Sequence, residues 1–278
     1  MLRKYWKIYN FQDHKSVATP FDSSVHLFPV NNDNDVVNQK EYASIIDSLR
    51  YATDCTRPNI AYAVGVLSRF TSKPSRDHWQ AIERVMKYLS GTKLHGLFYK
   101  NYPAVLEGFS DTYWNTLSGD SLSITGYIFT LGGGAIRWKA KKQIIITNST
   151  MEAELITLAS ASKEANWLRD LLYEIPLWEK PIPPILIYCN STATIGRVRN
   201  RFYNSKSRPM RRKHSTMRSY LSNDIINIKY VKSCDNLADP STKALTRKRV
   251  WNTSRGMGLK PIQSWTMYEV TQLRDQRS

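Results

Sequence analysis

The stretch ITGYIFTLGGGAIRW, residues 124–138, determines the fold class of this chain. Its two halves, Ile124–Leu131 and Ala135–Trp138, are rich in β-branched and aromatic residues, and three consecutive glycines separate them. Such a pattern predicts two strands joined by a tight turn. Two further apolar segments, Leu94–Tyr99 and Val105–Phe109, lie upstream and are also expected to be strands. The stretch therefore predicts an antiparallel meander.

Downstream of this meander, helical and strand patterns alternate. A long helix is expected over residues 150–173, a strand at Ile185–Cys189, a short helix, a further helix near His214–Leu221, a strand at Ile225–Val231 and a last helix after Asp239. Strands separated by helices pair in parallel. The prediction is an α/β fold in which a mixed sheet is flanked by helices.

The region before the meander has a different pattern. Apolar residues at helical spacing predict three helices between residues 41 and 92, which would form a small helical subdomain. Residues 1–40 contain Pro20, Pro29 and a run of Asn and Asp, and are expected to be irregular. No signal is assigned to residues 261–278.

Composition limits the class of protein. The chain has 278 residues, 41% of them hydrophobic, and a formal net charge of +17, so a polyanionic partner is expected, nucleic acid before a membrane. Three cysteines cannot form a disulfide framework, and no pair of them has zinc-ligand spacing. No apolar run is long enough to span a bilayer, and the N-terminus lacks the apolar core of a secretory signal. We expect an intracellular protein, cytoplasmic or nuclear, that is not secreted.

Two acidic positions follow from local structure. Asp111 comes directly after the expected strand Val105–Phe109, where it could project into a cleft or serve as a turn residue. Ser149 and Glu152 match a capping box, which gives Glu152 a structural role. Glu154 has no such role. It shares the face of the long helix that should pack on the sheet, with Leu158, Ala161, Ala165, Leu168 and Leu172. A buried carboxylate is costly unless it is paired or binds a metal, so a functional Glu154 is favoured.

Two more polar positions lie at element ends. Asn190 follows the strand Ile185–Cys189 and could bind a metal through its amide oxygen, or could cap the next helix. Asp239 precedes Pro240, a common start for a helix, so it is a candidate N-cap whose second oxygen would remain free for a metal.

Basic residues gather in two places. Nine Lys or Arg and no acid fall between Arg197 and Arg218: Arg197, Arg199, Arg201, Lys206, Arg208, Arg211, Arg212, Lys213 and Arg218. A second cluster places Trp138 beside Lys139, Lys141 and Lys142. Surface charge runs are usually mixed in sign, so contact with nucleic-acid phosphates is favoured over a simple solvated surface.

Several ordered motifs together resemble one family. They are Tyr51–Val64 (YATDCTRPNIAYAV), His78-Trp79 with Lys87–Thr92 (KYLSGT), Gly126–Phe129 with Trp138–Gln143 (WKAKKQ), Ser149–Glu154 (STMEAE) and Asn236–Pro240 (NLADP). Their order and spacing over roughly residues 18–260 resemble the C-terminal part of a copia-type LTR-retrotransposon Pol polyprotein, most like plant copies. The resemblance implies the end of the reverse transcriptase, a helical connection and an RNase H-like domain with a five-stranded mixed sheet.

The resemblance also implies a reaction and a site. RNase H enzymes hydrolyse the RNA of an RNA·DNA hybrid with two divalent ions, Mg²⁺ or Mn²⁺, held by four acids. Carried over to this chain, those positions are Asp111, Glu154, Asn190 and Asp239. The third is normally Asp, so the metal ligands here would be Asp111, Glu154 and Asp239. Three carboxylates bring less charge than four, and we expect weak metal binding and impaired catalysis.

The expected organisation and the alternatives follow. We expect an N-terminal segment at residues 1–40, a helical connection at 41–92, an RNase H-like domain at 93–260 and a tail at 261–278.

No Asp-Asp pair of a polymerase palm, integrase zinc motif or aspartic protease motif is found, so the chain is interpreted as a truncated Pol open reading frame that could associate with other Pol-derived domains. The main alternative is a catalytically inactive nucleic-acid-binding remnant. A basic assembly protein has no support beyond charge.

Overall fold

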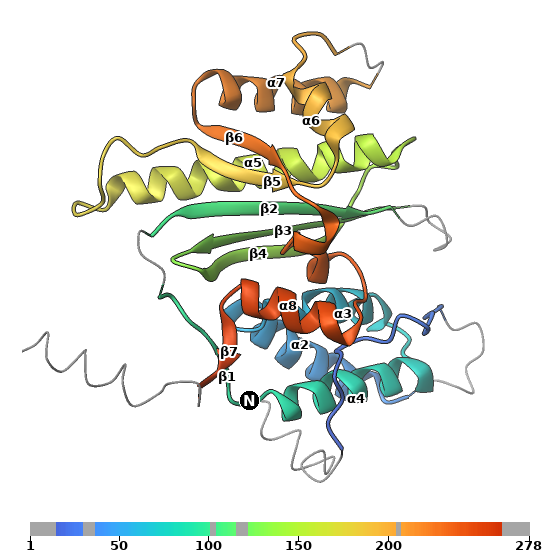
Figure 1. Cartoon of the computed structure of the whole chain (residues 1–278). Coiled ribbons are helices and arrows are strands. Elements are labelled where there is room, and N and C mark those ends of the chain that lie inside the picture. The colour runs from blue at the N-terminus through green and yellow to red at the C-terminus, as the bar shows by residue number, and fades with distance from the viewer. Residues whose placement is uncertain (1–14, 30–36, 101–103, 115–121, 204–206, 263–278) are drawn as a thin grey trace, which may run out of the picture.

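The main sheet has five strands in the order β4-β3-β2-β5-β6 (Figure 1). The computed structural model describes residues 15–29, 37–100, 104–114, 122–203 and 207–262. The strands are β2 (Leu106–Tyr113), β3 (Ile124–Leu131), β4 (Gly134–Lys142), β5 (Ile185–Cys189) and β6 (Ile226–Tyr230). Pairing is antiparallel among β2, β3 and β4 and parallel from β2 to β5 to β6. The expected RNase H-like mixed sheet is confirmed.

The turn between β3 and β4 uses the glycine run as expected. Gly132 and Gly133 have φ angles of 57° and 76°, in the left-handed region that side chains disfavour. Two consecutive residues of this kind match the twist of a tight hairpin. These glycines therefore permit the tight turn that sets the register between β3 and β4.

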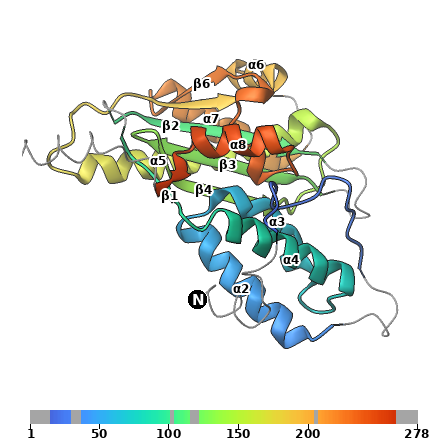
Figure 2. The same cartoon turned by 60° about the horizontal axis from the view of Figure 1, so that its bottom comes forward.

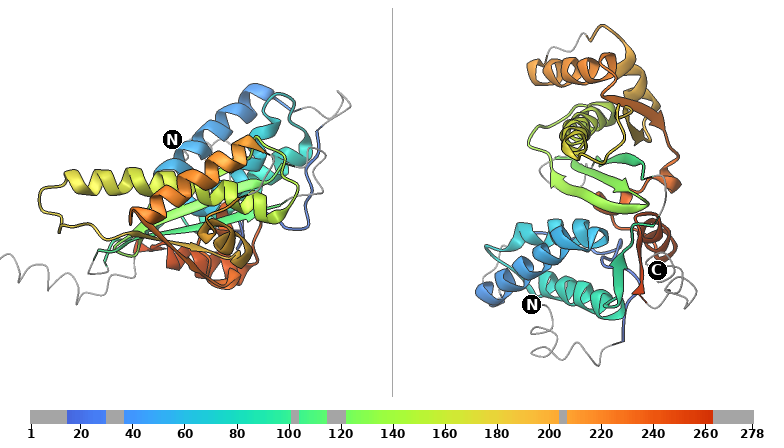
Figure 3. Two further views of the ribbon diagram at one scale, coloured as in Figure 1. Left: turned by 90° about the horizontal axis from the view of Figure 1, so that it is seen from above. Right: turned by 90° about the vertical axis from the view of Figure 1, so that its left-hand side faces the viewer.

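Helices cover one face of the sheet. They are α5 (Thr150–Glu174), α6 (Thr192–Arg199) and α7 (Arg208–Ser222). The predicted apolar stripe of α5 is buried, and its residues form one cluster with β2, β5 and β6. Figure 3 shows the resulting layers, with α5 and α7 on one side of the sheet and the N-terminal helices on the other.

The helical subdomain contains the three predicted helices. They are α2 (Gln39–Cys55), α3 (Ala61–Leu67) and α4 (Arg76–Gly91), linked by the short 3₁₀ turns η2 (Pro58–Ile60) and η3 (Ser68–Phe70) (Figure 2). Their core also includes Phe21, Leu245 and Val250. The last two belong to the segment that ends in helix α8 (Arg247–Gly256), so this C-terminal helix packs on the N-terminal subdomain.

The strand expected at residues 94–99 is found as β1 (His95–Leu97), which pairs with β7 (Leu259–Pro261) in a separate two-stranded sheet. Two other expectations about elements are wrong. Strand β2 does not end at Phe109 but continues through Asp111 to Tyr113, because its polar residues are buried and paired inside the sheet. After β6 and the turn η4 (Ser233–Asp235), Asp239 opens only the 3₁₀ turn η5 (Asp239–Ser241), and α8 begins at Arg247.

None of the helices in the described ranges is both long and apolar enough to cross a bilayer. Several sequence features lie outside those ranges. They are the run of Asn and Asp after residue 30, Lys206, and the tail from residue 263 onward.

Candidate active site

Asp111 lies near the end of the central strand β2, with only 1% of its surface exposed. Because β2 and β5 run parallel, their C-terminal ends meet at the same edge of the sheet. Asn190 immediately follows β5, and its Nδ2 donates a hydrogen bond of 2.9 Å to Oδ1 of Asp111. The turn interpretation of Asp111 is therefore wrong, and the structure brings Asp111 and Asn190 together.

Asp239 reaches the same edge from η5. The buried side chain of Asn236 holds this segment against β2, donating to the Ser110 carbonyl at 2.9 Å and accepting from the Ala238 N–H at 3.1 Å. Asp239 is fully buried. The residue at the N-cap position of η5 is Ala238, so the prediction that Asp239 caps a helix is wrong, and its carboxylate faces side chains instead.

Two cations and a hydroxyl hold the two aspartates. The Lys243 ammonium lies 3.0 Å from Oδ1 of Asp239 and 3.5 Å from Oδ2 of Asp111. Arg249, on α8, donates to Oδ2 of Asp239, and the Thr242 hydroxyl donates to Oδ2 of Asp111. The sequence reasoning missed all three residues. The i,i+4 spacing of Asp239 and Lys243 is the signal in the sequence that indicates this ion pair.

Glu154 comes from the second turn of α5 and is 4% exposed. A buried polar network lies beside it, in which Thr112, Thr125, Thr157 and Gln143 join β2 and β3 to α5 through hydrogen bonds of 2.5–3.3 Å. Its Oε2 has no hydrogen-bond partner in the described part of the chain. The prediction that Glu154 is buried where α5 packs on the sheet is confirmed.

The electrostatics follow from burial. Burial, and then the neighbouring Asp111 carboxylate, raise the pKa of Glu154 to about 8. The same two causes raise the pKa of Asp239 to about 6, although Lys243 and Arg249 oppose them. Burial disfavours the charged form of Lys243, but the Asp111 and Asp239 carboxylates outweigh it and the pKa of Lys243 is raised. Lys243 is therefore a cation at neutral pH.

The donor set fits a hard divalent cation in its chemistry. Asp111, Glu154 and Asp239 are buried carboxylates, and two buried oxygens, Oε2 of Glu154 and Oδ1 of Asn190, lack hydrogen-bond partners among the described residues. However, no three His, Cys, Asp or Glu side chains in the described ranges are already grouped to hold a metal ion. Lys243 and Arg249 instead supply the positive charge that the aspartates require.

The cap of α5 differs in one detail from the prediction. The Ser149 hydroxyl accepts from the Glu152 N–H at 3.3 Å, as a capping box requires. Glu152 reaches back to the N–H of Asn148 at 3.1 Å, one residue before the cap. Asn190 is not a cap, because Ser191 caps α6.

The residues predicted in the Trp138 cluster lie on two faces of β4. Side chains alternate along a strand, so Trp138 and Lys142 point to one face and Lys139 and Lys141 to the other. The Trp138 indole N–H donates to the Thr53 carbonyl at 2.9 Å, which joins β4 to α2. Trp138 therefore has a structural partner. Although the side chains alternate along β4, all four residues line one cavity, together with Arg50 and Arg69.

The second basic run lies on α6, α7 and the segment between them. Exposed basic side chains there include Arg197, Arg201, Arg208, Arg211 and Arg212, while Lys213 is half-buried. Arg199 is also exposed but donates to the Ile228 carbonyl at 3.0 Å, so it helps to hold α6 on β6. The structure thus gathers most of these cations on the helical layer above the sheet (Figure 1).

Comparisons with known proteins place the chain among retrotransposon proteins. No family model matches the chain. Over 251 residues it is 34% identical to a retrovirus-related Pol polyprotein from the transposon RE2 of Arabidopsis thaliana, a match that covers 90% of this chain and 17% of that protein. It is also 32% identical over 249 residues to the Pol polyprotein from the transposon TNT 1-94 of Nicotiana tabacum, covering 87% and 18%.

A shorter match is to a protein of a different description. Over 128 residues the chain is 42% identical to the secreted RxLR effector protein 161 of Plasmopara viticola, covering 46% of this chain and 90% of that protein. Because this match covers less than half of the chain, the family follows from the longer ones. The chain spans less than a fifth of the length of the Pol polyproteins it matches.

Among solved structures, the chain is similar to RNase H1 from Halobacterium salinarum, with a TM-score of 0.37 and 17% identity over 50% of this chain and 93% of that one. It is also similar to the foamy viral protease-reverse transcriptase, with a TM-score of 0.44 and 14% identity over 81% and 34%. At these scores the fold assignment rests on the strand order of the sheet. The long sequence matches and the RNase H-like sheet together show that the chain belongs to the copia-type LTR-retrotransposon Pol family and resembles its C-terminal part.

Proposed function

We propose that this chain hydrolyses the RNA strand of RNA·DNA hybrids, with catalysis impaired by Asn190. The observation that supports the proposal is the linkage of three of the four expected positions at one edge of the sheet. Asn190 donates to Asp111, and Lys243 joins Asp111 to Asp239. The fourth position, Glu154, is buried on α5, and the charge of Asp111 helps to raise its pKa.

Asp111, Glu154 and Asp239 would hold Mg²⁺ or Mn²⁺ through their carboxylates, and Asn190 could add its amide oxygen. Two such ions would activate the attacking water and stabilise the leaving 3′-oxygen. The chain's own contribution is to place the carboxylates and to exclude water from them, since all three are at most 4% exposed. The basic residues of α6 and α7 would bind the phosphates of the hybrid.

Three features of the site would weaken it. Asn190 brings no charge, and its N–H occupies Oδ1 of Asp111. Lys243 and Arg249 already neutralise the aspartates and would compete with a divalent ion. We therefore expect metal affinity and cleavage to be lower, by orders of magnitude, than those of a site with four carboxylates and no competing cations.

A second candidate function is compatible with the same cations. Lys243 and Arg249 offset part of the charge of the aspartates without metal, so a catalytically inactive nucleic-acid-binding protein could keep this arrangement. Association with other Pol-derived domains is a further proposal that fits either function, since the chain matches only a portion of its relatives.

Cleavage of an end-labelled RNA·DNA hybrid by the purified chain, in Mg²⁺ and in Mn²⁺, tests the proposal. We expect slow cleavage of the RNA strand only, and none by the Asp111→Asn variant, which circular dichroism should show to be folded. If the natural chain binds the hybrid but cleaves it in neither metal, or if Asp111→Asn cleaves equally well, the proposal is wrong.

A further inference from the structure

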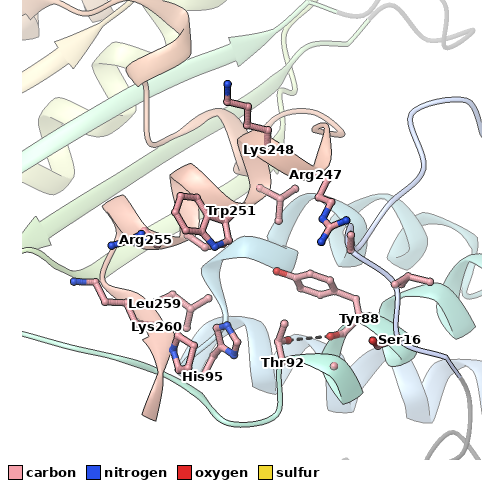
Figure 4. A pocket seen from close by; sticks show the side chains of 16 residues that line it. Ser16, Tyr88, Thr92, His95, Arg247, Lys248, Trp251, Arg255, Leu259 and Lys260 are labelled. Carbon is pink, nitrogen blue, oxygen red and sulfur yellow. Dashed lines mark hydrogen bonds between the residues drawn. The ribbon is translucent and has the colours of Figure 1, made fainter. Parts of the chain in front are cut away.

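A cavity lies away from the carboxylates, between helix α8 and the end of helix α4 (Figure 4). Its volume is about 830 Å³. One wall is formed by α8 and β7, and the opposite wall by Tyr88, Thr92 and the segment at Ser16. This volume is within the range of sites that bind small molecules or single nucleotides.

All of the Lys, Arg, Asp or Glu residues that line the cavity are basic, although most of its lining surface is apolar. Arg247, Lys248, Arg255 and Lys260 line it, and none of its lining residues is acidic. None of these four cations forms an ion pair with an acidic side chain in the described part of the chain. Like charges around one cavity repel one another, and an anion bound there would relieve that repulsion.

An exposed indole lies in the middle of these charges. Trp251 is 58% exposed, which is unusual for the largest apolar side chain. Arg247, Trp251 and Arg255 are spaced four residues apart on α8 and so lie along one side of the helix. The Arg255 guanidinium lies 4.5 Å from the centre of the Trp251 ring. Figure 4 shows the indole between Arg255 and Lys260 at one end and Arg247 and Tyr88 at the other.

We propose that this cavity binds unpaired nucleotides of a nucleic-acid strand, with a base stacked on Trp251 and phosphates on Arg247, Arg255 and Lys260. An aromatic ring among unpaired cations is the combination by which proteins bind single strands without sequence preference. A nucleic-acid strand is favoured over an acidic peptide. The carboxylates of a peptide would pair with the cations, but they would not account for the exposed indole of Trp251.

Helix α8 connects this cavity to the carboxylates. Arg249 lies on the same helix and donates to Asp239, while Arg247, Trp251 and Arg255 face the cavity. A single-stranded extension of a hybrid could therefore be held by the helix that also contacts the candidate active site. The inference rests on the proposed function for the kind of substrate, but it requires neither metal nor cleavage.

Fluorescence anisotropy of the full chain, in EDTA, tests the inference with labelled hybrids that are blunt or carry a six-nucleotide single-stranded extension. We expect the extension to tighten binding about tenfold or more, since stacking contributes roughly 1–3 kcal/mol per base. Trp251→Ala should abolish this gain, and Trp251→Phe should keep most of it. Trp167→Ala is the matched control, because Trp167 is 56% exposed on α5 and lies outside the cavity.

Three results would overturn the inference. They are equal affinity for blunt and extended hybrids, a gain that survives in Trp251→Ala, and an equal loss of the gain in Trp167→Ala. An acidic peptide that displaces the extension as well as an oligonucleotide of equal charge would also overturn it. Failure of the proposed function gives a different result. If the chain does not cleave the hybrid but the extension still tightens binding through Trp251, the proposed function is wrong and the inference about the cavity holds.

Discussion

At the scale of single residues, the site is decided by what faces Asp111. An aspartate at position 190 would bring a second negative charge to within hydrogen-bonding distance of Asp111, and only bound cations would offset the repulsion. The asparagine instead donates an N–H to Oδ1 of Asp111 at 2.9 Å. Together with Lys243, it makes the carboxylates stable without a metal. The same asparagine that we propose weakens metal binding thus also stabilises the metal-free site.

Glu154 predicts a pH dependence of stability. Its pKa is about 8 in the folded protein and near the ordinary value of 4.5 when unfolded, so the folded state binds the proton more tightly. The free energy of unfolding of the metal-free protein should therefore fall as pH rises from about 4.5 to about 8. Glu154→Gln should remove roughly 1–4 kcal/mol of this fall, measured by urea unfolding at several pH values.

Glu152→Gln is the control for this prediction, because Glu152 lies in the first turn of the same helix and caps the Asn148 N–H. It should keep the pH dependence of the natural chain. Asp239, whose pKa is raised to about 6, accounts for part of the slope below pH 6 in all three proteins. Equal slopes for the natural chain and Glu154→Gln would show that Glu154 does not hold its proton when folded.

Sequence patterns predicted the residues of this site unequally. The helix phase was sufficient to predict that Glu154 is buried, although residues 153–159 are all buried, so burial at this end of α5 is not confined to one face. Lys243 and Arg249 could not be identified in this way. Their role depends on a 3₁₀ turn followed by a separate helix, and a local pattern cannot show which distant carboxylate a long basic side chain reaches.

At the scale of elements, the contact of η5 with β3 positions Asp239. Gly126 of β3 pairs with Asp111 of β2, and η5 lies directly on it. A Cβ atom at Gly126 would lie 3.0 Å from Cβ of Ser241 and closer still to the methyl group of Thr242. The glycine therefore permits the close approach that brings Asp239 beside Asp111.

Gly126→Ala should displace η5 from the sheet and destabilise the protein by about 1–3 kcal/mol. Urea unfolding measures this change. Gly196→Ala is the matched control, because Gly196 lies in α6 with nothing within 4 Å of its added Cβ. That variant should be unchanged or more stable by roughly 0.5–1 kcal/mol. A Gly126→Ala variant as stable as the natural chain would contradict the packing described here.

Strand boundaries were less predictable than strand positions. The strand Ile185–Cys189 is found as predicted, because an apolar run bounded by turn residues marks both of its ends. Strand β2 is longer than predicted because Ser110, Asp111 and Thr112 are polar yet buried. Hydrophobic patterns end a strand where polar residues begin, so they fail where a buried site occupies the strand.

At the scale of the whole molecule, positive charge is spread over several surfaces. The basic residues of α6 and α7 lie on one side of the sheet, while the cavity at α8 adjoins the helical subdomain on the other. A net charge of +17 predicts that hybrid binding weakens steeply with salt, because phosphate contacts release counterions.

Replacing Arg211, Arg212 and Lys213 together with Gln should reduce the slope of log affinity against log salt by about 2–3, since each phosphate that a cation neutralises adds nearly one to the slope. Anisotropy with a blunt hybrid at several salt concentrations measures the slope. Lys40, Arg50 and Arg76, three exposed cations of the helical subdomain, provide a control variant of equal charge. If the control variant changes the slope of log affinity against log salt as much as the α7 variant or more, the prediction that phosphates contact α7 is wrong.

Long-range connections were the least predictable part of the fold. The alternation of strands and helices was sufficient to predict a mixed sheet, and the family resemblance supplied its five strands. It could not predict that β1 and β7 pair outside that sheet or that Val250 packs with the helical subdomain. Such contacts join residues more than 150 positions apart and leave no local pattern. The proposed boundaries at residues 40, 92 and 260 remain predictions for the same reason.

Cleavage by Asn190→Asp is the most direct test of the claim that these four positions form a divalent-metal site for RNA hydrolysis. An end-labelled hybrid would be treated in Mg²⁺ with the natural chain, with Asn190→Asp and with the double variant that adds Asp111→Asn. The fourth carboxylate should raise cleavage at least about tenfold, which requires only about 1.4 kcal/mol of transition-state stabilisation, and the double variant should be inactive. A folded Asn190→Asp protein that cleaves no faster than the natural chain, or that cleaves equally well without Asp111, would contradict the account.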